Sequence, residues 1–221
     1  MFTSLPPLSC GGIAGAAAIV VEESTSAAGQ VLLLGGFDEQ GVALSTVHLV
    51  DLATGTCTPQ PALSYVRGNL SAARLPDGRI VCAGGYPAPT SSEVLGPPGG
   101  GASNAAWTWT QLPAMNVWRH NCCGCVMSNG CFAILGGSNY DGETSSCESL
   151  MVGEDAHWEP LHPLHHERSH LTCAAVARCI LVVGEDPLST EVYDEALNRW
   201  VIRLPCDLPG DSRGSMSSAL M

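Results

Sequence analysis

The sequence predicts an all-β protein built from repeated units of four short antiparallel strands. Apolar runs that end in glycine recur at intervals near fifty residues. Each run is followed by a second repeated position, which holds a Trp or another apolar residue. An arginine comes after this second position. The 25 glycines and 15 prolines supply many turns, which suits short strands better than long helices.

The first repeated signal is the apolar run before glycine. Its final glycines are residues 36, 85, 137 and 184, so the intervals are 49, 52 and 47 residues. A run of four or five apolar residues has the length of a strand buried on both faces, and glycine allows a sharp exit and close packing. In the fourth run we place Val183 where the others have their first glycine. The glycines with this structural role are Gly35, Gly36, Gly84, Gly85, Gly136, Gly137 and Gly184.

The second signal is a pair of apolar positions seven residues apart. Tyr193 precedes Trp200 by seven residues, Met151 precedes Trp158, and Val50 precedes Cys57. In the second unit a glycine-rich insert, GPPGGGASN, lengthens the spacing before Trp109. A Trp at this place has a large apolar body and an N–H that needs a partner, so it is suited to sealing one unit against the next.

The third signal is an arginine that follows the Trp position. Arg67, Arg119 and Arg168 each come four residues after an apolar residue, and a looser fourth copy contains Arg213. Three signals in one register resemble the kelch repeat, in which each unit is one four-stranded blade of a β-propeller. The resemblance covers nearly the whole chain, with Cys57 as a departure at the first Trp position.

The resemblance implies one domain over residues 1–221, with blades at about 10–61, 67–112, 119–161 and 168–204. Segments 1–6 and 214–221 match an outer and an innermost strand, so we expect an incomplete ring that missing sequence or another chain completes. In the third blade we predict strands at 120–127, 131–137, 145–152 and 157–161. We also predict that 13–21 is an innermost strand, where small side chains fit the crowded axis.

The composition limits the classes of binding partner and the cellular compartments that we expect for this protein. The chain has no lysine, and its nine arginines stand against 21 acidic residues, for a net charge of −12. A surface that negative disfavours nucleic acid and anionic membranes. No signal peptide or membrane helix is visible, and the eleven cysteines are irregularly spaced. We therefore expect free, mostly buried thiols and a cytoplasmic or nuclear location.

The arginines are the main candidates for a binding site. In kelch adaptors of ubiquitin ligases, arginines at this repeated place line a pocket that holds acidic peptides. The resemblance implies that Arg67, Arg119, Arg168 and Arg213 face a ligand at one mouth, where guanidinium groups bind carboxylates bidentately. The alternative is that each arginine pairs with an acidic residue of a neighbouring blade.

Loop residues after the glycine pairs are the second group of candidates, because binding residues concentrate on loops. Tyr140 is the best single contact candidate, and Asp141 lies beside it; the alternative is that Tyr140 folds onto its own loop. The group His165, His166 and His170 is predicted to lie in a turn that spoils metal geometry. Cysteines 122, 123, 125 and 131 are read as small buried residues rather than a zinc site. We therefore predict no metal, no cofactor and no catalytic residue.

Three functions remain open from the sequence. The favoured one is a protein–protein interaction module that binds a protein or an acidic peptide, as a ubiquitin-ligase adaptor would. The second is a kelch-like enzyme or a metal-dependent specifier protein, although the four tyrosines are scattered. The third is a structural subunit of a larger assembly.

Overall fold

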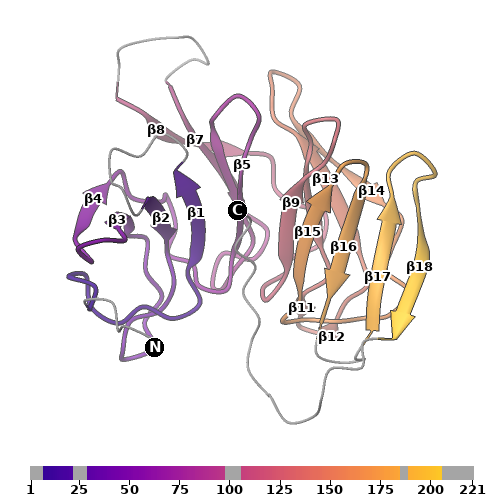
Figure 1. Ribbon diagram of the computed structural model, residues 1–221, viewed down its shortest axis with the longest axis horizontal. Coiled ribbons are helices and arrows are strands. Elements are labelled where there is room, and N and C mark those ends of the chain that lie inside the picture. The colour runs from indigo at the N-terminus through magenta and orange to yellow at the C-terminus, as the bar shows by residue number, and fades with distance from the viewer. Residues whose placement is uncertain (1–6, 22–28, 98–105, 185–188, 206–221) are drawn as a thin grey trace.

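The computed structural model describes residues 7–21, 29–97, 106–184 and 189–205, which form four four-stranded antiparallel sheets (Figure 1). The first sheet contains β1 (Ala17–Val21), β2 (Gln30–Leu34), β3 (Val47–Asp51) and β4 (Cys57–Gln60). The second contains β5 (Ser71–Arg74), β6 (Ile80–Ala83), β7 (Ser92–Gly96) and β8 (Thr108–Leu112). The third contains β9 (Cys123–Val126), β10 (Phe132–Leu135), β13 (Cys147–Met151) and β14 (His157–Leu161). The fourth contains β15 (Thr172–Val176), β16 (Cys179–Val183), β17 (Ser189–Asp194) and β18 (Arg199–Pro205).

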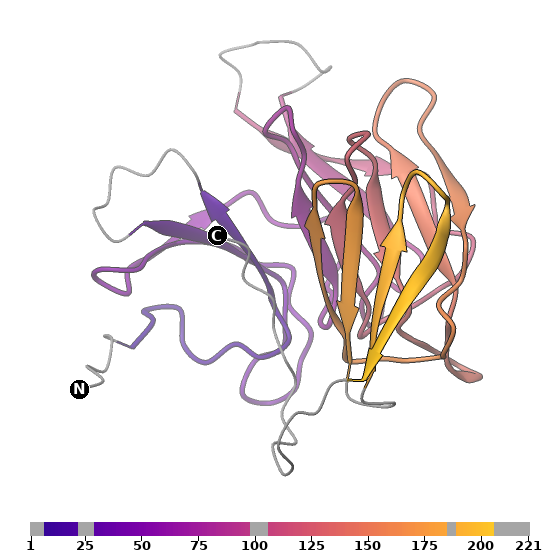
Figure 2. The same ribbon diagram turned by 45° about the vertical axis from the view of Figure 1, so that its right-hand side comes forward.

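The sheets follow one another in chain order, and the first strands of neighbouring sheets lie side by side. β1 adjoins β5, β5 adjoins β9, and β9 adjoins β15, as Figures 1 and 2 show. An apolar cluster fills each of the three spaces between consecutive sheets. Each sheet therefore buries apolar side chains against its neighbours, which a single four-stranded sheet could not do alone.

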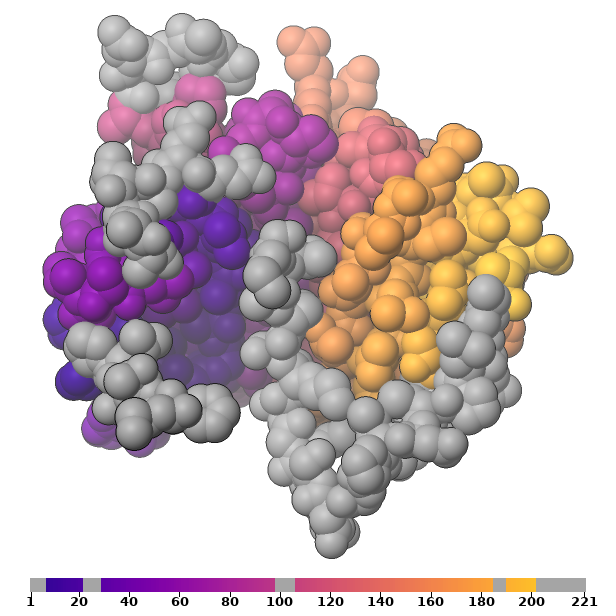
Figure 3. Space-filling model, viewed as in Figure 1, coloured from indigo at the N-terminus to yellow at the C-terminus, as the bar shows by residue number. Residues whose placement is uncertain are grey.

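The two end sheets each have one face with no neighbouring sheet in the described residues. Val20 on the first sheet is 46% exposed, and Leu181 and Val201 on the fourth are 37% and 39% exposed. Figure 3 shows the outward face of the fourth sheet as the orange-to-yellow surface on the right. At the position of Leu181 the second and third sheets have Val81 and Ala133, which are fully buried between sheets.

The all-β prediction is confirmed, and the strands of the third unit lie inside their predicted ranges. The structure adds a small hairpin that the sequence did not suggest, made of β11 (Ser138–Asn139) and β12 (Gly142–Glu143). Of the predicted strand at 13–21, β1 forms the second half, and Ala14 makes an isolated bridge to Phe37. Within the described residues no helix is long and apolar enough to cross a membrane.

Strand pairing corrects two details of the predicted repeat. Val183 pairs with Thr172 as Leu135 pairs with Cys123, so Gly184 is equivalent to the first glycine of the pair. The prediction that Val183 takes this place was therefore wrong. Trp158 pairs with Leu150, which is fully buried, whereas Met151 is 50% exposed. Leu150 is thus the residue equivalent to Tyr193, because buried and exposed side chains alternate along a strand.

The glycine pairs bind the backbone of the arginine that leads into the next sheet. Gly137 N–H donates to the carbonyl of Arg168 at 2.8 Å, and a Cβ on Gly136 would lie 2.8 Å from that same oxygen. Both glycines have positive φ, 56° and 105°. The pairs at 35–36 and 84–85 make the same contact with the carbonyls of Arg67 and Arg119. This contact explains why the glycine and arginine signals share one register.

Antiparallel strands bring two kinds of segment to one end of every sheet. These are the loops between the second and third strands and the segments that lead from one sheet into the next. We call this end the loop face; it lies at the bottom of Figure 1, beside β11 and β12. The short hairpin turns, such as 75–79 and 127–131, lie at the other end, which we call the turn face.

Candidate functional site

The three described arginines of the repeat are fully buried, and each is paired with a glutamate of the sheet that it precedes. The ion pairs are Arg67–Glu93 at 2.9 Å, Arg119–Glu148 at 2.8 Å and Arg168–Glu191 at 2.9 Å. The arginine side chains are 0% exposed, and the partner glutamates are at most 3% exposed. A ligand on the loop face therefore does not reach these guanidinium groups.

The two terminal nitrogens of Arg119, Nη1 and Nη2, each make two hydrogen bonds, while its buried Nε makes none. Its Nη1 donates to the carbonyls of Gly136 and Ser146, both at 2.7 Å. Its Nη2 donates to Ser146 Oγ at 2.8 Å as well as to Glu148. Arg67 makes the same set of bonds to Gly84, Ser91 and Glu93. Buried charges are stable only when such bonds satisfy them.

Each glutamate also fixes the segment that leads from the preceding sheet into its own sheet. Glu148 accepts the backbone N–H groups of Asn116 and Val117 at 2.8 and 3.0 Å. Glu93 accepts that of Ser64, and Glu191 accepts that of His165. The expectation that Arg67, Arg119 and Arg168 form an exposed ligand site is therefore wrong. The alternative, pairing with an acidic residue of a neighbouring blade loop, differs from the structure as well, because each partner glutamate lies on a strand of the arginine's own unit. Arg213 lies outside the described residues.

Tyr140 lies where a partner could contact it, on the loop face at the tip of the β11–β12 hairpin. Its side chain is 86% exposed, and its ring centroid is 3.6 Å from that of Trp118 at an interplanar angle of 46°. Tyr140 therefore packs on the preceding segment rather than on its own loop. Asp141 is exposed beside it, and its N–H donates to Asn139 Oδ1.

The hairpin that holds Tyr140 is anchored on both sides. Ser138 and His120 exchange two backbone hydrogen bonds of 2.8 and 3.1 Å, which join the hairpin to the segment of Trp118. On the other side, Ser169 Oγ donates to Glu143 Oε1 at 2.6 Å. Because these bonds are already made, Tyr140 and Trp118 are held ready before any partner arrives, which lowers the entropy cost of binding.

Further aromatic side chains lie on the same loop face. Tyr86 is 57% exposed and bridges to Gly68, which Phe37 covers. Tyr65 is also exposed, and its hydroxyl accepts a bond from Gln111. Three of the four tyrosines thus lie on this face, and the fourth, Tyr193, is buried.

The exposed charge of the loop face is acidic. Glu39, Asp141, Glu143 and Glu167 are exposed, while the arginines of this face that the structure describes are buried and neutralised in pairs. The partly exposed or exposed histidines of the loop face are His120, His162, His165, His166 and His170. Burial, together with the nearby His170, lowers the pKa of His120. His120 therefore adds no positive charge near neutral pH. With exposed carboxylates and buried arginines, the loop face attracts cations.

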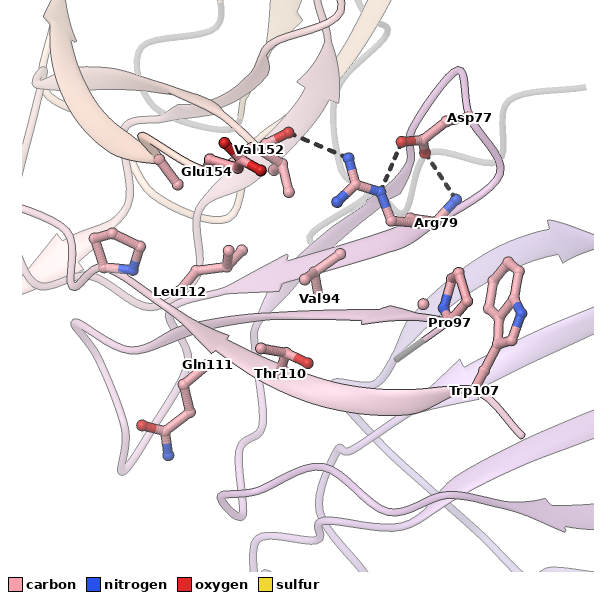
Figure 4. Close-up of a pocket in the computed structure, with 14 residues that line it drawn as sticks. Asp77, Arg79, Val94, Pro97, Trp107, Thr110, Gln111, Leu112, Val152 and Glu154 are labelled. Carbon is pink, nitrogen blue, oxygen red and sulfur yellow. Dashed lines mark hydrogen bonds and ion pairs between the residues drawn. The ribbon is translucent and has the colours of Figure 1, made fainter. Parts of the chain in front are cut away.

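A hollow lies on the turn face between the second and third sheets, with a volume of about 830 Å³ (Figure 4). Trp107, Val94 and Leu112 form apolar parts of its wall, and Glu154 lies on the opposite side. Arg79 bonds to Asp77 Oδ2 at 2.6 Å and to the carbonyl of Val152 at 3.2 Å. This arginine therefore ties the two sheets together across the hollow.

The cysteines and histidines do not gather into a metal site in the described part of the chain. No group of three or more His, Cys, Asp or Glu side chains is placed there to hold a metal ion. Cys123, Cys125 and Cys147 lie in the apolar cluster between the third and fourth sheets. Burial raises the pKa of Cys147 to about 11, so this thiol stays protonated and unreactive at neutral pH.

Two functional features were missed in the sequence. The position of Trp118 gave no signal, because spacing alone does not distinguish a partly exposed Trp from a buried one. The glutamates could have been found, since Ser-x-Glu occurs as 91–93, 146–148 and 189–191, at the same place in three units.

Comparison with known proteins adds no relative. No protein-family model matches the chain, and no curated protein is significantly similar to it.

Proposed function

We propose that the protein is a kelch-type β-propeller, or part of one, that acts as a protein-interaction module. Four consecutive four-stranded sheets with adjacent first strands support the propeller. The apolar outward faces of the first and fourth sheets support the idea that further sequence or another chain completes the ring. This completion stays a prediction.

The partner that we propose is a cationic segment of another protein, bound on the loop face. The observation that carries this proposal is the pair of the exposed Tyr140 and the partly exposed Trp118, beside the exposed Asp141 and Glu143. A Lys or Arg side chain could lie on the aromatic rings while its charge meets the carboxylates. An acidic partner was expected because the arginines of the repeat were predicted to face it. The structure removes this reason, since Arg67, Arg119 and Arg168 are buried in ion pairs.

The test is selection of binding peptides from a random displayed library on the immobilised protein. We expect the enriched peptides to carry Lys or Arg next to aromatic or proline residues. The affinity of a synthetic enriched peptide, measured by calorimetry, should fall about tenfold or more in Trp118→Ala and in Tyr140→Ala. It should also weaken with added salt, because salt screens exposed charges.

Trp107→Ala is the matched control, since Trp107 is a 40% exposed Trp at the turn face. It should bind the peptide as well as the unaltered protein does. Enrichment of acidic peptides would contradict the proposal. So would equal affinity of the Trp118→Ala variant and the unaltered protein.

A further inference from the structure

The first sheet differs from the others at the position that anchors the outer strand. In the other sheets the indole N–H of Trp109, Trp158 and Trp200 donates to a backbone carbonyl of the segment leading into that sheet. The acceptors are the carbonyls of residues 61, 113 and 162, at 2.8 to 2.9 Å. Cys57 takes this position in the first sheet, so its indole anchor is missing.

A second thiol lies where the missing anchor would act. Ser9 N–H donates to the carbonyl of Gly55 at 3.0 Å, and Cys57 N–H donates to Ser9 Oγ at 2.9 Å. These two bonds hold the segment of Cys10 against β4. Because Ser9 is bonded to both Gly55 and Cys57, its chain neighbour Cys10 lies close to Cys57, and each thiol shifts the pKa of the other. The two bonds of Ser9, beside Cys10, thus take the place of the Trp-to-backbone contact of the other sheets.

The exposure of these two cysteines sets them apart. Of the ten described cysteines, seven are buried and only Cys10, Cys57 and Cys179 are partly exposed. Burial and the contact with Cys57 raise the pKa of Cys10 to about 11. Burial also acts on Cys57, but hydrogen bonds from Cys10 and Ser9 outweigh it and lower its pKa. One sulfur is thus suited to attack as a thiolate while its neighbour holds the proton.

We propose that Cys10 and Cys57 form a reactive dithiol site that low-molecular-weight disulfides, such as glutathione disulfide, convert reversibly to a protein disulfide. The Cys57 thiolate attacks one sulfur of glutathione disulfide, which releases one glutathione thiolate and leaves a mixed disulfide. Cys10 then loses its proton, and its sulfur attacks the Cys57 sulfur and displaces the second glutathione thiolate. The protein loses two hydrogens and two electrons, and both appear in two molecules of glutathione.

The product would replace a weak contact by a covalent link between the segment at 7–12 and β4. A disulfide that joins residues far apart in sequence restricts the unfolded chain. The oxidised protein should therefore unfold at a higher temperature than the reduced protein, by about 4 °C or more for a chain of this size. This inference concerns the outer edge of the first sheet and does not depend on the proposed ligand of the loop face.

The experiment is to equilibrate the full chain with glutathione buffers of increasing oxidised fraction and then block free thiols with an alkylating reagent. Digestion after acidic residues separates Cys10 from Cys57, because Glu22, Glu23, Asp38 and Asp51 lie between them. Mass spectrometry should detect a Cys10–Cys57 linked peptide that disappears on reduction. The thermal midpoint should rise with the amount of this peptide.

Two variants and an internal control make the result decisive. Cys10→Ser should accumulate the mixed disulfide on Cys57, because no sulfur is left to displace glutathione. Cys57→Ser should leave Cys10 largely unmodified, and Cys179 should react more slowly than Cys57 in every sample. If no linked peptide forms at any ratio, or if Cys179 reacts as fast as Cys57, the proposal is overturned. Failure of the peptide-binding proposal would leave these outcomes unchanged.

Discussion

The first and third sheets share one backbone plan but differ at three matched positions. The third sheet has Arg119, Glu148 and Trp158. In the first sheet the same places hold Ile13, His48 and Cys57, as hydrogen bonds between sheets and strand pairing show. The second and fourth sheets keep the full set of arginine, glutamate and Trp. Arginine, glutamate and Trp therefore occur together or not at all.

The reason for this grouping lies in the preceding sheet. Glu148 accepts backbone N–H groups from the segment that leaves the second sheet, so its charge is satisfied only where such a segment is present. Without that environment a buried carboxylate or guanidinium group would be unpaired and costly. The first sheet has no preceding sheet in the described residues, and the position equivalent to Glu148 holds His48. Its Nδ1 is buried without a hydrogen-bond partner.

The largest expected effect comes from breaking the buried pair of the third sheet. Arg119→Ala leaves the Glu148 carboxylate buried without its cation, and we expect a loss of about 3–5 kcal/mol of unfolding free energy. Denaturant unfolding followed by circular dichroism measures it. Arg79→Ala serves as control, because the Arg79–Asp77 pair is partly exposed and should contribute about 1 kcal/mol or less. Equal losses in the two variants would show that the burial of Arg119 has no energetic importance.

An intermediate effect is expected where the glycine pair meets the arginine backbone. In Gly136→Ala the new Cβ would lie 2.8 Å from the carbonyl of Arg168 at a positive φ, so the variant should lose about 1–3 kcal/mol. Gly153→Ala is the matched control, since no atom lies within 4 Å of its added Cβ and its φ is not in the left-handed region. The same unfolding assay applies. A Gly136→Ala protein as stable as the Gly153→Ala protein would rule out this packing constraint.

The smallest effect is expected from building the missing pair into the first sheet. Ile13→Arg and His48→Glu, made singly and together, form a double-mutant cycle for comparison with the Arg119–Glu148 cycle. Both positions are partly exposed, so the new pair should contribute about 1 kcal/mol or less. A coupling energy as large as that of the third sheet would mean that the preceding sheet is unnecessary for the pair.

Much of the strand arrangement could be predicted, because it depends on local patterns. Short apolar runs, turn residues and a repeat near fifty residues indicated four units of antiparallel strands, and the strands of the third unit fall where expected. The register errors at Val183 and Met151 were each one residue long. A shift of one residue turns a side chain to the other face of a strand, and only the pairing partner on the next strand decides it.

The candidate site was much harder to predict. Tyr140 and Asp141 are exposed on the loop face as the sequence suggested, since a polar loop after a strand tends to lie at the surface. The sequence predicted the correct end of each sheet for the arginines, but it predicted that they face a ligand, whereas their side chains are buried. Whether an arginine faces a ligand or a buried glutamate depends on a residue 23 to 29 positions later, which sequence spacing alone did not connect.

The sequence by itself determined the repeat, the strand content and the places where an arginine, a glycine and a Trp must recur. These follow from local backbone preferences and the periodic burial of apolar side chains. Only the tertiary structure decided that three arginines are buried in ion pairs, that Trp118 packs against Tyr140, and that Ser9, beside Cys10, is bonded to Cys57. Each of these facts depends on atoms from segments far apart in the chain, because desolvation of a charge and contact between side chains are properties of the packed molecule.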